Sequence, residues 1–397
     1  MAVLNAHPVQ YQAPLFKKIS ENPEIDLMVY FCWDFGVKEA SFDAQFGKKI
    51  KWDISVLEGY KYKFLKNYSL KPSSDFLGQI NFGIIKEIYN LKKQNYNAVV
   101  VFGWNAFTNW LAFLTAFILG LPIFLRGESP LNQELLKPKW KIKIKKIILG
   151  TLFKFISVFL YIGEENKKFY RFYGVPEEKL FFTPYAVDNS RFIKAARDLK
   201  YKKKYLRKEL GIDEKSVVIL FVGKLIEKKR PMDLLKAYEL LSKNQNLKTK
   251  TCLLFVGDGA LWPELENYAK ENNLQDVHFV GFKNQTELPQ YYAMADIFVL
   301  PSGVGETWGL VINEAMCFGL AIIVSDRIGC AKDLARNGEN GYIFPFSDAG
   351  KLSEYLGNLI EDNKKIKRFG EKSFEIIQNY SHQGDVGGTL TALNSLE

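Results

Sequence analysis

Short apolar runs of the length of a β-strand alternate with helical stretches along this chain, in two separate series. In the second half, VVILFV (217–222), CLLFV (252–256) and IFVL (297–300) are each followed by a stretch with helical periodicity. Runs that are apolar throughout are typical of strands buried on both faces of a parallel sheet. Because parallel strands need crossover connections, which are usually helical, each series predicts an α/β domain with helices on both faces of its sheet.

The length of the chain agrees with two domains, because 397 residues exceed what one hydrophobic core usually organises. Residues 193–205 are rich in charge and poor in large apolar side chains, which predicts a linker. We therefore predict two Rossmann-like domains, at 1–192 and 206–375, that face each other across a deep cleft. A last helix within 376–397 is expected to cross back to the first domain. Ligands of open parallel sheets bind beyond the carboxyl ends of the strands, so functional residues should follow strands.

The bulk composition narrows the classes of partner and location. The formal net charge is +10, and a basic surface suits nucleotide phosphates, anionic lipid or nucleic acid. The four cysteines are scattered and form no C-x-x-C pair, which favours a reducing compartment, and no signal peptide is evident, so we expect a cytoplasmic protein. The most apolar stretch, Trp110–Leu125, is broken by Gly120 and Pro122 and falls short of the about 20 residues that span a bilayer.

The loop after the 217–222 strand is the first candidate site. Gly223 ends the strand, Lys224 follows at once, and Lys229 lies at the entrance of the next helix. Two cations beside the free N–H groups of a strand-to-helix turn make a good diphosphate site. A plain solvated loop is the alternative interpretation. Gly257, in the turn FVGDG after the next strand, either belongs to a ligand loop or only permits a positive φ.

Two glutamates, Glu306 and Glu314, flank a Trp-Gly-Leu step after the 297–300 strand. The segment WGLVINEAMCFG is predicted to be a helix, and the N–H groups of Trp308, Gly309 and Leu310 would be its unpaired N-terminal donors. An ionised glutamate in an apolar helix is costly unless it has hydrogen-bond partners, and sugar hydroxyls are such partners. One acid is expected to hold a hexose and the other a ribose, with a diphosphate between them. A capping acid plus a buried ion pair is the alternative.

These motifs together resemble a known family. Glu306 and Glu314, preceded by YYAMADIFVLPS and followed by EAMCFGLAIIVSD, are similar to the nucleotide-sugar site of family 4 retaining glycosyltransferases of GT-B fold. GKLIEKK, FVGDG, VHFVGF and DLARNGENGYIFP follow the order and spacing of that family, with Lys224 in place of the usual arginine. The resemblance covers most of residues 206–350. It is looser over GVPEEKLFFTPYAVDNSRF and HPVQYQAPLF.

The resemblance implies transfer of a sugar from a nucleotide sugar, with retention at the anomeric carbon, to an acceptor held by the N-terminal domain. It implies that Lys224 and Lys229 bind the diphosphate, Glu306 the donor sugar and Glu314 the ribose. The remaining implied donor-binding residues are Gly223, Gly257, Gly281, Phe282, Trp308, Gly309 and Leu310. The nucleotide sugar is a substrate, so no cofactor is expected. The sequence has no Asp-x-Asp, so no metal is expected either, and basic side chains with a helix N-terminus would offset the leaving-group charge.

The N-terminal domain departs from the family pattern at two places. Many members carry glycines after the first strand, and a histidine after the strand that matches PIFL. After the first strand, this chain has residues with larger side chains instead of glycines. After the strand that matches PIFL, it has Arg126 and Glu128. Arg126 and Glu128 either act on the acceptor as catalytic residues or pair with each other, and the first-loop histidine is either structural or catalytic. The first-loop and acceptor candidates are His7, Gln10, Tyr11, Gln12, Trp104 and Asn105.

The segment Lys137–Phe159 combines many lysines with an apolar face. Trp140, Ile144 and Ile147 share that face at helical spacing, and the lysines lie on another. A basic amphipathic helix can lie on an anionic membrane surface. Peripheral association with the inner face of the plasma membrane and an ordinary domain helix with solvated lysines are the two interpretations.

Three classes of function are compatible with parts of this pattern. The first is a hexosyltransferase of cell-surface polysaccharide or glycoconjugate biosynthesis, with a UDP-sugar favoured over GDP-mannose and a glycan or lipid-linked acceptor. The second is a GT-B-fold sugar-nucleotide epimerase or a phosphorylase. The third is a basic nucleic-acid-binding protein, but the sequence has no recognisable reading helix or RNP-type aromatic pattern, so no nucleic-acid partner is expected.

Overall fold

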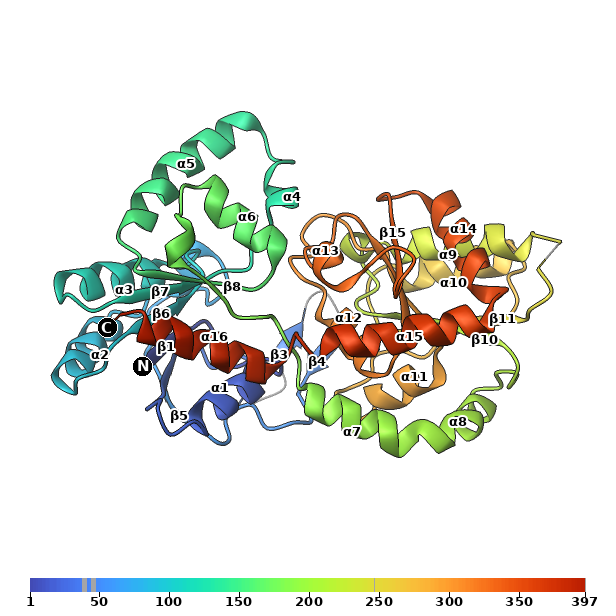
Figure 1. The fold of residues 1–397 in the computed structure, drawn as a ribbon, viewed down its shortest axis with the longest axis horizontal. Coiled ribbons are helices and arrows are strands. Elements are labelled where there is room, and N and C mark those ends of the chain that lie inside the picture. Colours follow the sequence, from blue (N-terminus) through green and yellow to red (C-terminus); the bar gives the residue numbers. More distant parts are fainter. Residues whose placement is uncertain (38–40, 44–47, 246, 397) are drawn as a thin grey trace. The chain divides into compact units, whose positions relative to one another are not determined.

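The computed structural model describes residues 1–37, 41–43, 48–245 and 247–396, with the side chains of 41–43 and 48–50 left aside. The chain divides into two compact units, which are coloured along the sequence in Figure 1. Unit 1 comprises Met1–Ser41, Ile54–Val187 and Ser381–Glu397, and unit 2 comprises Phe42–Asp53 and Asp188–Tyr380. Each unit is built around its own parallel sheet.

Unit 1 contains a seven-stranded sheet in the order β5-β2-β1-β6-β7-β8-β9, with every neighbouring pair parallel. Val3 and Val100 face one layer of the core, and Leu4 and Val101 face the other, as the alternation of side chains along a strand requires. The strands are β1 (Ala2–Asn5), β2 (Met28–Phe31), β5 (Lys61–Phe64), β6 (Val99–Phe102), β7 (Ile123–Arg126), β8 (Val158–Tyr161) and β9 (Leu180–Phe182). A separate pair is formed by β3 (Ser41–Asp43) and β4 (Lys48–Ile50).

Helices cover both faces of this sheet. The helices α1 and α16 bury apolar residues in one core layer, and α2, α3, α5 and α6 bury theirs in the other. The α-helices are α1 (Ala13–Ser20), α2 (Gly83–Lys93), α3 (Phe107–Ile118), α4 (Leu131–Glu134), α5 (Lys139–Lys154), α6 (Glu164–Phe172) and α16 (His382–Asn394). The 3₁₀ turns are η1 (Phe76–Gly78) and η2 (Glu177–Lys179).

Unit 2 contains a six-stranded parallel sheet in the order β12-β11-β10-β13-β14-β15. All six residues of β10 are buried, which fits a strand covered on both faces. The strands are β10 (Val217–Val222), β11 (Thr251–Val256), β12 (Val277–Phe279), β13 (Ile297–Leu300), β14 (Ala321–Ser325) and β15 (Gly341–Phe344). The central position of β10 brings the loops after β10, β11 and β13 to one edge of the sheet.

The connections of unit 2 are helical, as the alternating pattern predicts. The α-helices are α7 (Asn189–Leu199), α8 (Lys203–Glu209), α9 (Pro231–Ser242), α10 (Trp262–Glu271), α11 (Leu288–Met294), α12 (Leu310–Cys317), α13 (Ala331–Leu334), α14 (Ala349–Ile360) and α15 (Asn363–Ile377). The 3₁₀ turns are η3 (Lys200–Lys202) and η4 (Glu227–Lys229). The predicted fold class, two Rossmann-like α/β domains with parallel sheets, is confirmed.

The unit boundaries differ in detail from the predicted domain boundaries. The second segment of unit 2 begins at Asp188, and residues 193–205 lie within it as the end of α7, η3 and the start of α8. Lys203 in this stretch donates to the Ala295 carbonyl through Nζ at 2.9 Å, and the nearby Arg207 is buried and donates to the Met294 carbonyl through Nη2 at 2.7 Å, so these helices pack against the rest of unit 2. The last helix, α16, groups with unit 1, starting from Ser381.

Candidate functional site

Two glycine turns of unit 2 pack directly against each other at the edge of the sheet. A Cβ atom on Gly257 would lie 1.8 Å from the Gly223 carbonyl oxygen, and one on Gly259 would lie 2.5 Å from the Leu225 carbonyl oxygen. The Gly257 N–H in turn donates to the Gly281 carbonyl at 2.9 Å. The turns after β10, β11 and β12 therefore touch through their backbones, which explains glycine at 257 and 259 without any ligand.

The loop after β10 is joined to the loop after β13 by an ion pair. The Lys229 ammonium pairs with the Glu306 carboxylate, and the two side chains keep 15% and 11% of their surface exposed. The Gly303 N–H donates to the Lys228 carbonyl at 2.8 Å and ties the same two loops together through the backbone. Lys229 and Glu306, which the sequence predicts to act in one site, are thus in direct contact.

The charges of two lysines act on the Glu306 carboxylate. Burial acts to raise the pKa of Glu306, but the charges of Lys229 and Lys228 outweigh it and hold that pKa below its usual value. Burial also lowers the pKa of Lys228, Glu306 opposes this, and the charges of Lys229 and Lys224 add to it. The positive charge of these lysines favours the ionised form of Glu306 and would also attract an anion.

Lys228 was not among the predicted site residues. Its side chain passes over Gly305, where an added Cβ would lie 3.3 Å from the Lys228 Cε. The only sequence signal was its place in the run Glu227-Lys228-Lys229-Arg230, and the sequence alone does not show which of these neighbouring cations faces the site. Arg230 has a separate role, because it adopts a left-handed φ of +54° at the start of α9 and pairs with Asp233 at 2.7 Å.

The helix after Glu306 begins two residues later than predicted. Gly309 has a φ of +100° and precedes the first helical residue, Leu310, so the N–H of Trp308 lies outside α12. The indole of Trp308 is buried and donates to the Asn313 Oδ1 at 2.9 Å, so this side chain anchors the loop within the protein. The first turn of α12, from Leu310, presents the N-terminal N–H groups at the edge where Glu306 lies.

Glu314 lies inside α12 and is almost completely buried. The Tyr292 hydroxyl donates to the Glu314 Oε2 at 2.6 Å. Burial raises the pKa of Glu314 to about 7, although the Tyr292 hydrogen bond and the charge of Arg191 act in the opposite direction. The Arg191 guanidinium itself donates to the Gln285 carbonyl at 2.9 Å. Tyr292 and Arg191 are partners that no local pattern indicated, since they come from α11 and α7.

A strap from the first segment of unit 2, which includes Lys51 and Asp53, contacts the chain just after Gly281 and Phe282. The Asn284 amide donates to the Lys51 carbonyl at 2.8 Å, and the Thr286 N–H donates to the Asp53 carboxylate at 3.0 Å. Gly281 has a φ of +75°, which explains a glycine at the turn. No local sequence pattern indicates these contacts, because they join residues that are far apart in the chain.

The predicted first-loop residues lie in unit 1, mostly in contact with other side chains. Burial lowers the pKa of His7, against a hydrogen bond between its Nδ1 and the Pro8 carbonyl at 3.1 Å. The Gln12 Oε1 accepts from the Asn5 amide at 2.5 Å, and the Tyr11 ring lies edge-on to Tyr185 with 5.9 Å between ring centres. Gln10 is partly buried.

Arg126 pairs with a residue that the sequence did not indicate. Its Nη2 lies 2.6 Å from the Asp385 Oδ2 on α16, and the two side chains keep 4% and 1% of their surface exposed. Glu128 accepts a hydrogen bond from the Tyr185 hydroxyl at 2.7 Å. The geometry favours a structural role for Arg126, because its charge is matched inside the core of unit 1.

The two acceptor candidates after β6 differ in their surroundings. The Trp104 ring stacks on Phe169 with 5.7 Å between ring centres, and an added Cβ on Gly127 would lie 2.5 Å from the Trp104 ring. Trp104 therefore packs in the core of unit 1. The exposed Asn105 donates to the Ser74 carbonyl at 3.2 Å.

The described residues contain neither a candidate metal site nor a helix that could span a membrane. Within the ranges that the structure describes, no group of three or more histidine, cysteine, aspartate or glutamate side chains could hold a metal ion. No helix among those residues has the length and apolar character needed to cross a membrane.

Known proteins resemble this chain in sequence and in fold. Residues 191–375 match the family model described as Glycosyl transferases group 1. Spore coat protein SA of Bacillus subtilis (strain 168) is 33% identical over 179 residues, which are 42% of this chain and 45% of that protein. Overall, the chain spans about half the length of the first curated relatives it matches.

A longer match is found with a relative from Campylobacter jejuni subsp. jejuni serotype O:2. It is named N,N'-diacetylbacillosaminyl-diphospho-undecaprenol alpha-1,3-N-acetylgalactosaminyltransferase and is 26% identical over 290 residues, 71% of this chain and 74% of that protein.

Among solved structures, the HepE protein of Anabaena in complex with UDP has a TM-score of 0.73 with 18% identity, covering 100% of both chains. This similarity concerns the fold. Residues 191–375 of this chain are therefore similar to glycosyl transferases group 1, and the chain has the GT-B fold, with two Rossmann-like domains.

Proposed function

We propose that this protein is a family 4, retaining, metal-independent glycosyltransferase that moves a sugar from a UDP-sugar to a glycan or lipid-linked acceptor. The observation that carries the proposal is the Lys229–Glu306 ion pair, flanked by Lys224 and Lys228, at the edge of the sheet where α12 begins. A carboxylate and several cations close together suit a ligand that joins sugar hydroxyls to a diphosphate.

The diphosphate of the donor lies among the lysines. Two phosphate groups carry enough negative charge to match Lys224, Lys228 and Lys229, and the first N–H groups of α12 add further donors. When the bond to the sugar breaks, negative charge develops on the leaving diphosphate. The lysines and the helix N-terminus stabilise that charge, which is the part a metal ion takes in enzymes with an Asp-x-Asp motif.

The two glutamates hold the two sugars of the donor. Without donor, Lys229 neutralises Glu306. With donor bound, Lys229 turns to phosphate, and the Glu306 carboxylate accepts hydrogen bonds from hydroxyls of the transferred sugar. Glu314, which accepts from the Tyr292 hydroxyl, offers its carboxyl group to the ribose. The leaving phosphate takes the proton of the acceptor hydroxyl, so the acceptor attacks from the side of the leaving group and the configuration is retained.

The relatives support the choice of donor and acceptor. The HepE structure of similar fold contains UDP, which favours a UDP-sugar over GDP-mannose. The name of the Campylobacter relative describes an acceptor with an undecaprenol diphosphate. We therefore propose a lipid-linked acceptor and a role in cell-surface polysaccharide or glycoconjugate biosynthesis.

An apolar surface of unit 1 supports association with a membrane. On α5, the side chains of Trp140 and Ile147 are 61% and 72% exposed, and Ile144 and Ile148 are exposed beside them. The patch continues to α3, because Phe155 after α5 contacts Phe117 with 4.9 Å between ring centres. Exposed lysines of α5 surround it. An apolar patch with a basic rim suits an anionic membrane surface, where the enzyme would meet a lipid-linked acceptor.

The transfer reaction can be tested directly. Release of UDP or GDP from a panel of UDP- and GDP-sugars is measured with and without lipid-linked acceptors, in the presence of EDTA. We expect release from a UDP-sugar that requires an acceptor and persists in EDTA, and an α-linked product from an α-linked donor. Conversion of the donor without acceptor would instead indicate an epimerase, and dependence on inorganic phosphate would indicate a phosphorylase.

Membrane association has its own test. The protein is sedimented with vesicles of phosphatidylglycerol or of phosphatidylcholine. We expect binding to phosphatidylglycerol only, and loss of that binding in Trp140→Glu/Ile147→Glu. The matched control, Tyr201→Glu/Tyr205→Glu, changes two exposed aromatic residues of unit 2 and should bind like the original protein. Equal binding of both double variants would contradict this part of the proposal.

A further inference from the structure

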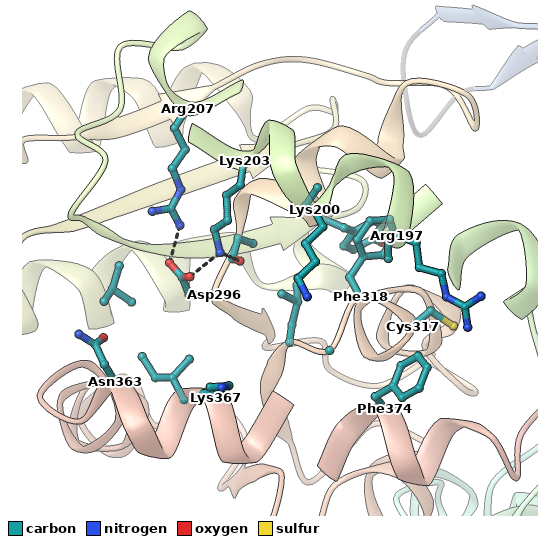
Figure 2. Close-up of a pocket in the computed structure, with 18 of the residues that line it drawn as sticks. Arg197, Lys200, Lys203, Arg207, Asp296, Cys317, Phe318, Asn363, Lys367 and Phe374 are labelled. Atoms are coloured by element: carbon teal, nitrogen blue, oxygen red, sulfur yellow. Dashed lines mark hydrogen bonds and ion pairs between the residues drawn. The ribbon is translucent and has the colours of Figure 1, made fainter. Parts of the chain in front are cut away.

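A groove with a volume of about 930 Å³ lies in unit 2, away from the candidate donor site (Figure 2). Its lining includes Val217 at the start of β10, Asp296 just before β13 and Leu320 just before β14. The candidate donor residues follow the carboxyl ends of the same strands, so the groove lies at the opposite edge of the sheet. Its volume falls in the range of small-molecule pockets, roughly 300–1,000 Å³.

Helices form the two walls of the groove. One wall is made by α7, η3 and α8, and the other by α15, while the end of α12 contributes to the floor. Figure 2 shows Lys200 reaching down from the first wall, with Lys367 on the wall opposite. An occupant between the walls would therefore meet a cation from each side.

The groove carries a surplus of positive charge. Six basic and two acidic side chains line it. The carboxylate of Asp296 is already matched, because Lys203 Nζ lies 2.7 Å from its Oδ1 and Arg207 Nη2 lies 2.6 Å from its Oδ2. The other acid, Glu214, pairs with Lys204, which is outside the lining. Of the four other basic residues, Lys367 is 3.9 Å from Glu371 in an exposed pair, which is weak in water. The charges of Arg197, Lys200 and Lys215, together with this weakly paired Lys367, attract an anion.

The groove also has apolar surface. Phe318 lies at the end of α12, Ile193 on α7, and Phe374 on α15 is exposed. Exposed aromatic surface beside these cations favours a ligand with two parts, because an anion alone would leave the phenylalanines in contact with water.

We propose that this groove binds a small molecule in which a phosphate group is attached to a flat, apolar body. The phosphate lies between Lys200 and Lys367, and the body rests on Phe318 and Phe374. Such an occupant would also contact α12, whose other end begins the candidate donor site. Tyr292, which lines the groove, donates to Glu314 on the same helix.

The test uses 1-naphthyl phosphate as the probe and the full chain. Isothermal titration calorimetry is performed with UDP present at saturation, so that the donor site is occupied. We expect a Kd below about 1 mM, and binding of 1-naphthol and of inorganic phosphate at least about tenfold weaker. Binding of UDP is measured separately, so failure of the proposed glycosyltransferase function would be seen there, and not in the probe titration.

Charge-reversal variants assign the binding to the groove. Lys200→Glu/Lys367→Glu should weaken probe binding at least about tenfold. The matched control, Lys202→Glu/Lys364→Glu, changes a lysine on η3 and one on α15 that do not line the groove, and it should bind like the original protein. Lys367→Glu alone serves if the double variant does not fold, because this side chain is 81% exposed.

Three results would overturn the proposal. These are no binding of the probe to the original protein up to about 1 mM, unchanged binding in the groove variants, and equal affinity for inorganic phosphate and for the probe.

Discussion

Two ion pairs at strand ends show how differently the two units use buried charge. In unit 1, Arg126 at the end of β7 pairs with Asp385 on α16, and almost nothing of either side chain is exposed. In unit 2, Lys229 pairs with Glu306 between two loops, and both side chains remain partly open to solvent. The first pair joins two elements of one core, whereas the second lies at the edge of a sheet.

The surroundings of the pairs differ even more than their exposure. Arg126 also packs over the ring of Phe102, with 5.5 Å to the ring centre, so aromatic and acidic partners enclose it. The charge of Lys228 adds to that of Lys229 at Glu306, and the charge of Lys224 acts in turn on Lys228. We infer that the enclosed pair serves the fold of unit 1, and we propose that the more open pair exchanges its partners for a ligand. Four experiments test this comparison.

The largest expected effect is on stability in unit 1. Asp385→Ala leaves the buried Arg126 guanidinium without its partner, and we expect a loss of about 3–5 kcal/mol in the free energy of unfolding. The measurement is urea denaturation. The double variant Arg126→Met/Asp385→Leu removes both charges and should recover most of the loss. If Asp385→Ala is as stable as the original protein, the contrast between the two pairs does not hold.

The next effect is on activity in unit 2. Glu306→Gln keeps the shape of the side chain but removes its charge, and we expect the transfer rate to fall about 10²–10³-fold, as for the loss of one transition-state contact. Its melting temperature should change little. Glu227→Gln is the matched control, because Glu227 belongs to the same loop but has an exposed side chain, and it should keep full activity. A fully active Glu306→Gln would remove the central residue of the proposed site.

A smaller effect concerns the pH dependence of stability. The pKa of Glu314 is raised from 4.5 to about 7 in the folded state, so between these values the folded protein binds a proton that the unfolded chain has lost. The contribution of Glu314 is therefore fully present below about pH 4.5 and is lost as the pH rises towards 7. Between pH 5 and pH 8, we expect the free energy of unfolding of the original protein to fall by roughly 2–3 kcal/mol more than that of Glu314→Gln.

The measurement for Glu314 is chemical denaturation at the two pH values. The control is Glu271→Gln, which changes an exposed glutamate on α10 and should follow the original protein. Parallel pH profiles of the original protein and Glu314→Gln would show that Glu314 is ionised in the folded state already at pH 5.

The smallest effect tests the positive charge around Glu306. Lys228→Met removes one of the two lysines whose charges act on Glu306, and we expect the affinity for UDP, measured by calorimetry, to fall about tenfold. Lys236→Met on the exposed face of α9 should leave that affinity unchanged. An unchanged affinity in Lys228→Met would mean that the extra lysine belongs to the solvated surface and that Lys224 and Lys229 suffice.

Local pattern was enough to predict part of the site. Gly223, Lys229 and Glu306 were predicted to follow strands of one parallel sheet, and in such a sheet the loops after neighbouring strands meet at one edge. The contact between Lys229 and Glu306 agrees with that expectation. The start of α12 was misplaced by two residues, because Trp308 reads as helical in sequence while the left-handed φ of Gly309 interrupts the helix.

The sequence by itself determined the fold class, because apolar runs of strand length with helices between them can bury their surfaces only in parallel sheets covered on both faces. Only the tertiary structure decided which charges meet. Asp385 lies near the end of the chain and Arg126 in its first half, and Tyr292 reaches Glu314 from another helix. Periodicity reports the environment of one element at a time, whereas the partner of a buried charge depends on how distant elements pack together.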